Sequence, residues 1–312
     1  MAQLQLPQID LSGLREKHTG TPEWEAARAQ VLQALRSYGC FEVIYDGVNQ
    51  QLREAVFRNA AREVHSLPAE TKSQSPGYLG HATFKAVDSS ILDATPEGIQ
   101  SFTNLMWPQG NASFCETIKC YVEGLKELGR MIQKMVLEGL GVEEYHDSLV
   151  ESTHYTLRLS SYSNEPGQQQ KMEAFPSHKD PNLLTIIFQD EISGLEVQIK
   201  NGDWIRASPN SFIVMPADSF EAWTNGRLQS VKHRVVLNGD EMRHSTILAA
   251  APKEGYVVQA PKKLVDQHHP ALFKPFDFAE YFRFRTSEAA LKAEDVLKAY
   301  CGVQGDQVEE EA

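Results

Sequence analysis

Cysteine is scarce in this chain of 312 residues, which contains only Cys40, Cys115, Cys120 and Cys301. None of them forms a Cys-x-x-Cys pair, and their spacing matches no zinc-binding pattern. Free cysteines are mostly buried as small apolar side chains. We therefore expect reduced thiols, no disulfide framework and a cytoplasmic protein.

Long apolar runs and positive charge are also lacking. No run approaches the roughly 18–20 apolar residues that a membrane-spanning helix needs. The first eight residues, MAQLQLPQ, have neither a basic stretch nor an apolar core, so we expect no secretory signal. The chain has 30 Lys and Arg against 42 Asp and Glu, a net charge of −12. So acidic a chain lacks the clustered cations that bind phosphate backbones, and we expect neither a nucleic-acid nor a membrane partner.

The residues that are present change their periodicity near residue 150. Before it, helical patterns run from Thr21-Pro22 to Tyr38, from about Gln50 to Leu67 and from about Phe114 to Leu140, with a short strand at Cys40–Tyr45 between the first two. Residues 72–112 are rich in Gly, Pro, Ser and Asn, which favours loops that border a pocket.

After residue 150, short runs of branched and aromatic residues alternate with turn signals such as Ser193-Gly194 and Asn225-Gly226. Such runs are Tyr155–Tyr162, Leu183–Phe188, Leu195–Ile199, Phe212–Met215, Val231–Leu237 and Ser245–Ala249. Regular short strands predict a barrel or jelly roll. We expect one compact unit, mainly β, with a helical region at 1–150, a jelly-roll core at 151–260, and a C-terminal helical segment with an acidic tail at 261–312.

Among ten histidines, only His178 has a carboxylate two residues on, in His178-Lys179-Asp180. On extended backbone these two side chains share a face. His233, inside the expected strand Val231–Leu237, is the natural third ligand. Two imidazoles and one carboxylate that leave three positions open are typical of non-haem Fe(II) oxygenases. A single His-x-Asp also occurs as a surface polar pair, so this motif alone leaves both interpretations open.

Arg243 and Ser245 follow ten residues after His233 and share a face of the next strand. A guanidinium suits a bidentate grip on a carboxylate, and a buried one needs an anion beside it. That anion is either a ligand or a carboxylate of the protein. The full pattern, with His-x-Asp, a distant His and Arg-x-Ser in β segments, is far more specific than any of its parts.

At these residues the sequence resembles the 2-oxoglutarate-dependent Fe(II) dioxygenases of plants, over nearly the whole chain. The resemblance includes Gln8–Leu11 and Tyr38–Val43. Residues Gly98–Gly110, Ala222–Arg227 and Lys274–Phe276 are similar to the alkenyl/hydroxyalkyl-producing (AOP) branch, which was first associated with glucosinolate side chains. That branch also resembles hydroxylases of steroidal and other alkaloids.

The resemblance implies a double-stranded β-helix, or cupin-like jelly roll, that uses Fe(II), 2-oxoglutarate and O₂, with ascorbate expected to help in vitro. It assigns iron to the His-x-Asp pair and the distant histidine. It assigns the far carboxylate of 2-oxoglutarate to Arg243, Ser245 and Tyr162. The chemistry of this family is oxidative decarboxylation of 2-oxoglutarate to succinate and CO₂, coupled to hydrogen abstraction from a substrate C–H bond.

The chain departs from the family pattern at two positions. The wider family often has Asn two residues before the tyrosine, where this chain has Ser160, so one co-substrate hydrogen bond is not carried over. The middle residue of the His-x-Asp motif is commonly Thr, whereas here it is Lys179, which we expect to point away from the metal toward neighbouring packing or substrate. Asp180 is intact, which argues against halogenation.

The substrate is expected to be a small molecule held by apolar and aromatic side chains, and the protein to be a monomer. Candidate contacts are Phe175, Leu79, Phe84, Phe276, Phe278 and Tyr281. An apolar lining suits hydroxylation, desaturation or demethylation of an alkaloid, a steroid or a related product of plant specialised metabolism. The alternatives are an auxin-type hormone or a glucosinolate side chain, either of which requires a further cationic contact.

Two other functional classes share parts of this pattern. A cupin-type metal enzyme without a 2-oxo acid would leave Arg243 and Ser245 unexplained. A non-catalytic binding protein on the same fold would need a lost metal ligand, and all three expected ligands are present.

Overall fold

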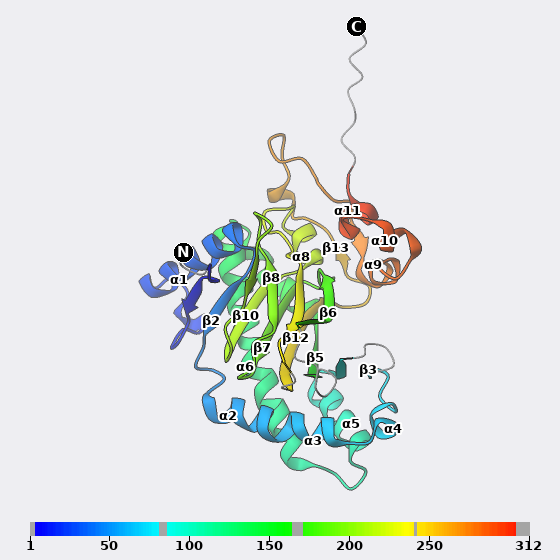
Figure 1. Cartoon of the computed structure of the whole chain (residues 1–312). Coiled ribbons are helices and arrows are strands. Elements are labelled where there is room, and N and C mark those ends of the chain that lie inside the picture. The colour runs from blue at the N-terminus through cyan, green and yellow to red at the C-terminus, as the bar shows by residue number, and fades with distance from the viewer. Residues whose placement is uncertain (1–3, 81–85, 164–170, 240–241, 304–312) are drawn as a thin grey trace.

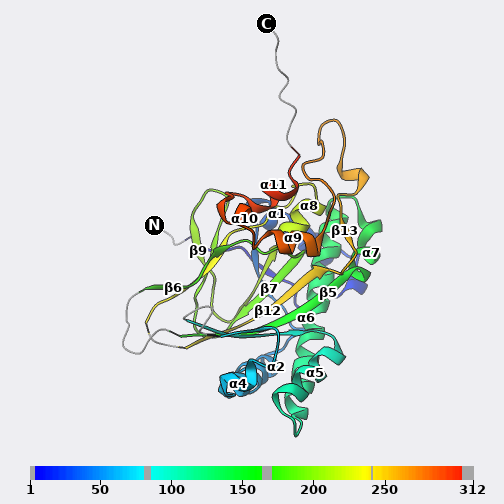
Figure 2. The ribbon, with the colours of Figure 1, turned by 90° about the vertical axis from the view of Figure 1, so that its right-hand side faces the viewer.

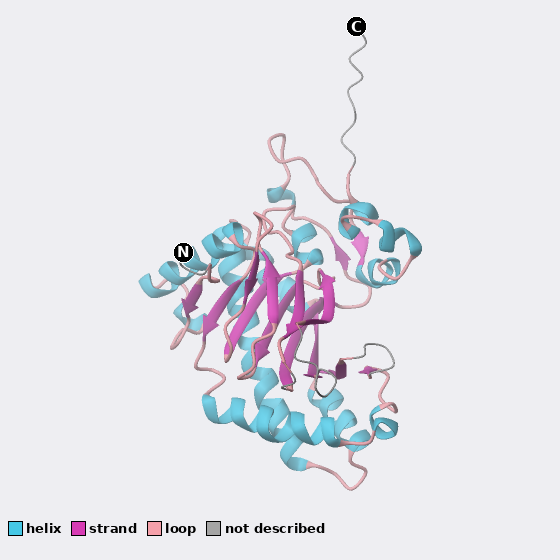
Figure 3. Ribbon diagram, in the orientation of Figure 1, coloured by secondary structure: helices cyan, strands magenta, loops and turns pink. Residues whose placement is uncertain are grey.

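The N-terminal half of the computed structural model consists mainly of helices, with short strands that join the central sheet (Figures 1 and 3). The structure describes residues 4–80, 86–163, 171–239 and 242–303. The elements of this half are β1 (Gln8–Asp10), α1 (Pro22–Ser37), β2 (Phe41–Ile44), α2 (Gln50–Glu54), α3 (Ala61–Ser66), α4 (Ala69–Lys72), β3 (Tyr78–Leu79), β4 (Val87–Asp93), α5 (Pro96–Met106), α6 (Ala112–Gly139) and α7 (His146–Glu151), with 3-10 turns at Glu16–His18 and Glu143–Tyr145 and a π-helical segment at Ala55–Ala60.

The second half supplies most of the strands and ends in three short helices (Figure 2). Its elements are β5 (Thr153–Tyr162), β6 (Met172–His178), β7 (Leu184–Gln189), β8 (Leu195–Gln198), β9 (Trp204–Arg206), β10 (Ser211–Pro216), α8 (Asp218–Trp223), β11 (His233–Leu237), β12 (Arg243–Pro252), β13 (Val257–Val258), a 3-10 turn at Lys262–Leu264, β14 (Phe276–Asp277), α9 (Phe278–Phe284), α10 (Glu288–Lys292) and α11 (Val296–Cys301).

Two sheets form the core. The larger has eight strands in the order β1-β2-β10-β7-β12-β5-β4-β3, and the smaller has four in the order β6-β11-β8-β9. All pairings in these sheets are antiparallel except that of β1 with β2. This arrangement is consistent with the double-stranded β-helix expected from the sequence.

Helix α6 supports the larger sheet from behind. The Asn111 side chain caps its first turn by accepting a hydrogen bond from the Phe114 backbone N–H. Its apolar stripe is buried in the main core, which also contains residues from β12 and α9. The Tyr121 hydroxyl meets the Thr246 hydroxyl of β12 at 2.6 Å, in the buried interior. One core thus includes residues of all three regions distinguished by sequence, which supports the proposal that they fold as one unit.

The sequence-based assignments missed several elements, among them β4, α5, β6 and β9. Residues 72–112, expected to be loops, contain β4 and α5. Strand β4 pairs along its length with β5, and its polar sequence Asp88-Ser89-Ser90 hides the alternation that normally marks a strand. Strand β6 was not predicted, because its sequence contains Pro176 and proline is unfavourable inside a sheet. Proline is tolerated here since β6 is an edge strand.

The four cysteines are free thiols, and three of them are buried, as expected. Within the described residues, no helix combines the length and the apolar composition that a membrane span requires.

Replacing Tyr121 by Phe should lower the free energy of unfolding by about 1–2 kcal/mol, because it leaves the buried Thr246 hydroxyl without its partner. Urea denaturation of both proteins measures this difference. The matched control is Tyr38→Phe, since the half-buried Tyr38 makes no hydroxyl hydrogen bond to any described residue. Equal effects of the two substitutions would show that the hydrogen bond between Tyr121 of α6 and Thr246 of β12 does not stabilise the fold.

Candidate active site

Strand pairing brings the three expected metal ligands together. His178 ends β6 and His233 begins β11, and the two are direct partners in the antiparallel ladder. Asp180 follows two residues after His178, just beyond the strand. One ligand atom from each of these residues lies within 4.8 Å of the other two, the only such group of three or more His, Cys, Asp or Glu in the part of the chain that the structure describes.

Backbone carbonyls fix the orientation of both imidazoles. Nδ1 of His178 lies 2.9 Å from the carbonyl oxygen of Pro176. Nδ1 of His233 lies 3.4 Å from that of Val231. In each ring an Nδ1–H that donates to the carbonyl leaves Nε2 as the free lone pair. Both Nε2 atoms face the same carboxylate, at 3.5 Å from Asp180 Oδ1 for His178 and 3.8 Å from Asp180 Oδ2 for His233.

The protonation states suit a cation. Burial alone would raise the pKa of Asp180, but His233, His178 and a 2.6 Å hydrogen bond from the Thr185 hydroxyl hold it well below its usual range. Burial, with the neighbouring His178, lowers the pKa of His233 to about 4. An ionised Asp180 carboxylate and a neutral His233 imidazole are donors that Fe(II) accepts, so these residues fit the metal that the sequence predicted.

A buried cation lies nearby on the larger sheet. Arg243 is 1 % exposed, and its guanidinium lies 4.8 Å from the centre of the Tyr162 ring, its direct partner on β5. Its Nη1 donates to the Ser245 hydroxyl at 3.3 Å, whereas its Nε has no partner among the described residues. No described carboxylate pairs with it. Desolvation lowers the pKa of Arg243, and this cost falls when an anion binds beside it. Of the two sources of an anion left open by the sequence, a ligand is therefore favoured.

Gln189 holds that guanidinium, and no motif in the sequence singles it out. Its Oε1 accepts from Arg243 Nη2 at 3.1 Å and from the backbone N–H groups of Gly194 and Leu195. Its Nε2 donates to two backbone carbonyls. A Cβ at Gly194 would lie 2.7 Å from Arg243 Cδ, so the arginine needs glycine there. The one available signal was a polar residue directly after the apolar run Leu183–Phe188.

One cavity of about 410 Å³ joins the two groups. Its lining includes the three metal ligands, the Arg243, Ser245 and Tyr162 cluster, and residues of both sheets. The remaining lining relevant here is Ile91, His154, Thr156, Arg158, Phe175, Phe278 and Phe282. Of these, sequence reasoning named Phe175 and Phe278 and missed Arg158 and Phe282.

Three expected substrate contacts, Leu79, Phe276 and Tyr281, are not among the described residues that line this cavity, and their role stays a prediction. Tyr281 is fully buried on another face of α9 from Phe278, and its hydroxyl donates to Asp218 at 2.6 Å. Phe276 packs against the Tyr281 ring, with 5.3 Å between ring centres. Helical spacing cannot show which face of α9 meets the cavity. Phe84 lies outside the described residues.

The two departures from the family pattern have distinct surroundings. Ser160 accepts a hydrogen bond from the Ser89 hydroxyl at 2.8 Å, and Ser89 in turn accepts from Arg158 at 3.0 Å. Lys179 does not line the cavity. Its ammonium lies 3.4 Å from Asp295 and 3.7 Å from Glu221, so it contacts neighbouring structure and not the metal ligands.

Comparison with known proteins agrees with this site. The 2OG-Fe(II) oxygenase superfamily model matches residues 153–252, and the model for the N-terminal region of non-haem dioxygenases in morphine synthesis matches residues 6–107. The probable 2-oxoglutarate-dependent dioxygenase AOP1.2 of Arabidopsis thaliana is 38% identical, with 95% of each chain covered. AOP3 of the same plant, a 2-oxoglutarate-dependent dioxygenase, is 31% identical, with 96% of this chain and 98% of the relative covered.

Solved structures show the same fold. The rice dioxygenase for auxin oxidation superposes with a TM-score of 0.81 and 26% identity, over 96% of this chain and all (100%) of that chain. JOX2, solved in complex with 2OG, Fe and JA, superposes with a TM-score of 0.78 and 25% identity, over 96% of this chain and 90% of that one. With relatives of more than 30% identity along nearly its full length, the chain belongs to the 2-oxoglutarate- and Fe(II)-dependent dioxygenases and is related to their AOP members.

Proposed function

We propose that this dioxygenase oxidises a C–H bond of a small anionic metabolite, such as a hormone-type carboxylic acid or a glucosinolate. The observation that carries the proposal is Arg158, a cation in the substrate part of the cavity with no described carboxylate beside it. In this proposal His178, Asp180 and His233 hold the iron.

Arg243, Ser245 and Tyr162 would hold the far carboxylate of 2-oxoglutarate. Fe(II), when bound with 2-oxoglutarate and O₂, supplies the oxidant that abstracts hydrogen, and the co-substrate is converted to succinate and CO₂. The protein's own residues bind and orient the substrate and the co-substrate, and they exclude water from the site. Phe175, whose ring packs edge-on against His178 at 4.9 Å between centres, shields one side of the metal site.

Arg158 is placed to recognise a second anion. It alternates along β5 with Ser160 and Tyr162, so all three side chains leave the same face of the strand. Its Nη2 donates to the neutral Ser89 hydroxyl, and its buried Nε has no described partner. Its guanidinium lies 5.1 Å from the centre of the Phe175 ring. A half-buried cation whose described partners are only a hydroxyl and an aromatic face is stabilised by an anionic ligand.

The substrate region also offers an apolar surface, with Ile91, Phe278 and Phe282 in the lining. A substrate that fits both features has a hydrophobic body and one negative group. Among the relatives, the rice enzyme is a dioxygenase for auxin oxidation, and auxin is a small carboxylic acid. An alkaloid or steroid is the second candidate, because the same apolar side chains suit a polycyclic skeleton.

Replacing Asp180 by Ala should abolish succinate formation, since it removes the only anionic ligand of the proposed iron site. Asp180→Glu should be nearly as poor, because the longer side chain moves the oxygen out of position. Anaerobic calorimetric titration with Fe(II), followed by a succinate assay, measures both effects. Wild-type succinate formation by Asp180→Ala at equal iron would refute the ligand assignment.

Substitutions of Arg243 should act on the co-substrate and not on iron. Arg243→Lys keeps the charge but loses the planar fork, and should raise the 2-oxoglutarate concentration for half-saturation about ten-fold or more, the value of a charge-assisted hydrogen bond. Arg243→Ala should be worse. The measurement is a 2-oxoglutarate saturation curve at fixed iron. An unchanged curve for Arg243→Ala would mean that another residue holds the co-substrate.

Substitution of Arg158 by Gln should remove the enzyme's preference for carboxylic acids over their methyl esters as substrates. The wild-type enzyme is screened with pairs of small apolar carboxylic acids and their methyl esters, with substrate-stimulated succinate formation as the readout. We expect the acids to stimulate turnover at concentrations about ten- to a hundred-fold lower than their esters, a difference lost in Arg158→Gln. The ester of each pair is the internal control for shape. Equal use of acids and esters by the wild type would favour the neutral polycyclic class instead.

A further inference from the structure

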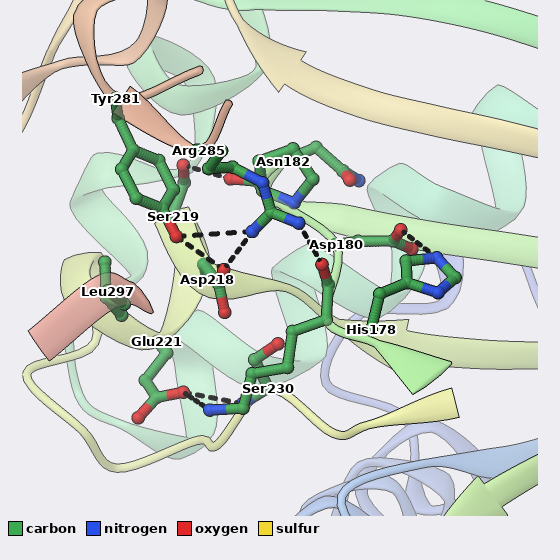
Figure 4. Close-up of polar contacts among 12 residues, drawn as sticks. His178, Asp180, Asn182, Asp218, Ser219, Glu221, Ser230, Tyr281, Arg285 and Leu297 are labelled. Atoms are coloured by element: carbon green, nitrogen blue, oxygen red, sulfur yellow. Dashed lines mark hydrogen bonds and ion pairs between the residues drawn. The ribbon is translucent and has the colours of Figure 1, made fainter. Parts of the chain in front are cut away.

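The turn that carries Asp180 is held from behind by the start of α8 (Figure 4). The Asp218 backbone N–H donates to the carbonyl oxygen of Asp180 at 2.9 Å. The backbone N–H and hydroxyl of Ser219 both reach the carbonyl oxygen of Pro181, at 3.2 and 2.5 Å. The backbone on the C-terminal side of the aspartate is therefore fixed by one helix.

Arg285 fixes the backbone on the other side of that aspartate. Its Nη2 donates to the carbonyl oxygen of Lys179 at 2.6 Å, while its Nη1 donates to the Asp218 carboxylate at 2.9 Å. The Tyr281 hydroxyl donates to the same carboxylate oxygen. In Figure 4, Arg285 lies between Asp218 and the turn before Asp180. Only the fork of an arginine can serve a carboxylate and a carbonyl from one rigid plane.

Arg285 and Lys179, the two cations of this cluster, contact different acids. Asp218 is 1 % exposed, so its carboxylate depends on Arg285 and the Tyr281 hydroxyl for compensation. The side chain of Lys179 serves a separate pair of acids, Glu221 and Asp295. Arg285 therefore contacts the backbone of residue 179 and not the lysine side chain.

Helix α9 connects this cluster to the substrate region. Tyr281 and Arg285, four residues apart, meet Asp218 behind the turn. Phe278 and Phe282, also four residues apart, line the cavity. One short helical segment thus contacts the proposed substrate space with one face and the backbone beside a proposed iron ligand with another.

We propose that Arg285 is a positioning residue, which holds the backbone before Asp180 against α9 and so sets where the carboxylate stands relative to the two imidazoles. The proposal rests on the assignment of His178, Asp180 and His233 as the metal site. Residues that orient metal ligands from outside affect metal affinity by about ten- to a hundred-fold when mutated.

The test is anaerobic calorimetry of the full chain with Mn(II), a redox-stable probe for the iron site, in the presence of 2-oxoglutarate. Arg285→Gln should bind Mn(II) about ten-fold more weakly than the wild type, and Arg285→Lys should lie between them. The matched control is Arg283→Gln, the same substitution at an exposed position of the same helix, which should leave the affinity unchanged. Titration of 2-oxoglutarate into each Mn(II)-saturated protein should give equal affinities, because Gln189 holds Arg243 separately.

Thermal unfolding separates positioning from stability. A lower Tm for Arg285→Gln with unchanged Mn(II) affinity would overturn the proposal, since it would assign the residue a purely structural role. Where Arg285→Gln alone does not fold, the pair Asp218→Asn with Arg285→Gln removes both buried charges, and Mn(II) affinity equal to that of the wild type would overturn the proposal as well. Asp180→Ala tests the metal site separately from the role of Arg285. Wild-type Mn(II) affinity in that variant would refute the metal site itself.

Discussion

His178 and His233 face each other across one antiparallel pairing, and the chemistry proposed for the cavity depends on that register. Successive residues of a strand point to opposite faces, so a slip by one residue would turn an imidazole out of the site. Two further features place the carboxylate beside these imidazoles. Asp180 is the next residue on the His178 face, and Thr185, at the second position of β7, reaches its carboxylate.

Buried charges have different partners on the two sides of the turn that carries Asp180. Behind it, Lys179 and Arg285 have carboxylates of the protein as partners. Inside the cavity, Arg243 and Arg158 have none among the described residues, although both lie largely away from solvent. A cation in a cavity without a carboxylate partner lowers the stability of the fold, and an anionic ligand that binds it reverses the loss. We regard this contrast as the physical basis for assigning two anionic groups, one on each ligand, to the cavity.

The sequence was sufficient for the features that depend on the period of a strand. His178 with Asp180, and Arg243 with Ser245, share faces because they are two residues apart, and the structure places both pairs at one cavity. Features that depend on tertiary approach could not be predicted. Arg158 alternates with the apolar Leu157 and Leu159, a pattern typical of an ordinary solvent-facing strand residue.

Helix α9 and Gln189 likewise depend on contacts between residues distant in sequence, which could not be predicted. Which face of α9 meets the cavity is set by the docking of Tyr281 on Asp218, a contact between residues distant in sequence. Gln189 is significant only because β8 and β12 bring Gly194 and Arg243 to its amide. Tyr162 was assigned by family resemblance alone, and the structure places it opposite Arg243.

The shape of the cavity has a kinetic consequence. Arg243 is almost fully enclosed, whereas Phe282, in the same lining, is 55% exposed. A dicarboxylate held by Arg243 would therefore lie deeper in the cavity than a metabolite that contacts Phe282. For entry from this exposed side, we expect the co-substrate to bind before the metabolite, and succinate to leave after the oxidised product. A metabolite that binds first would hinder entry of the co-substrate, so turnover would pass through a maximum as the metabolite concentration rises.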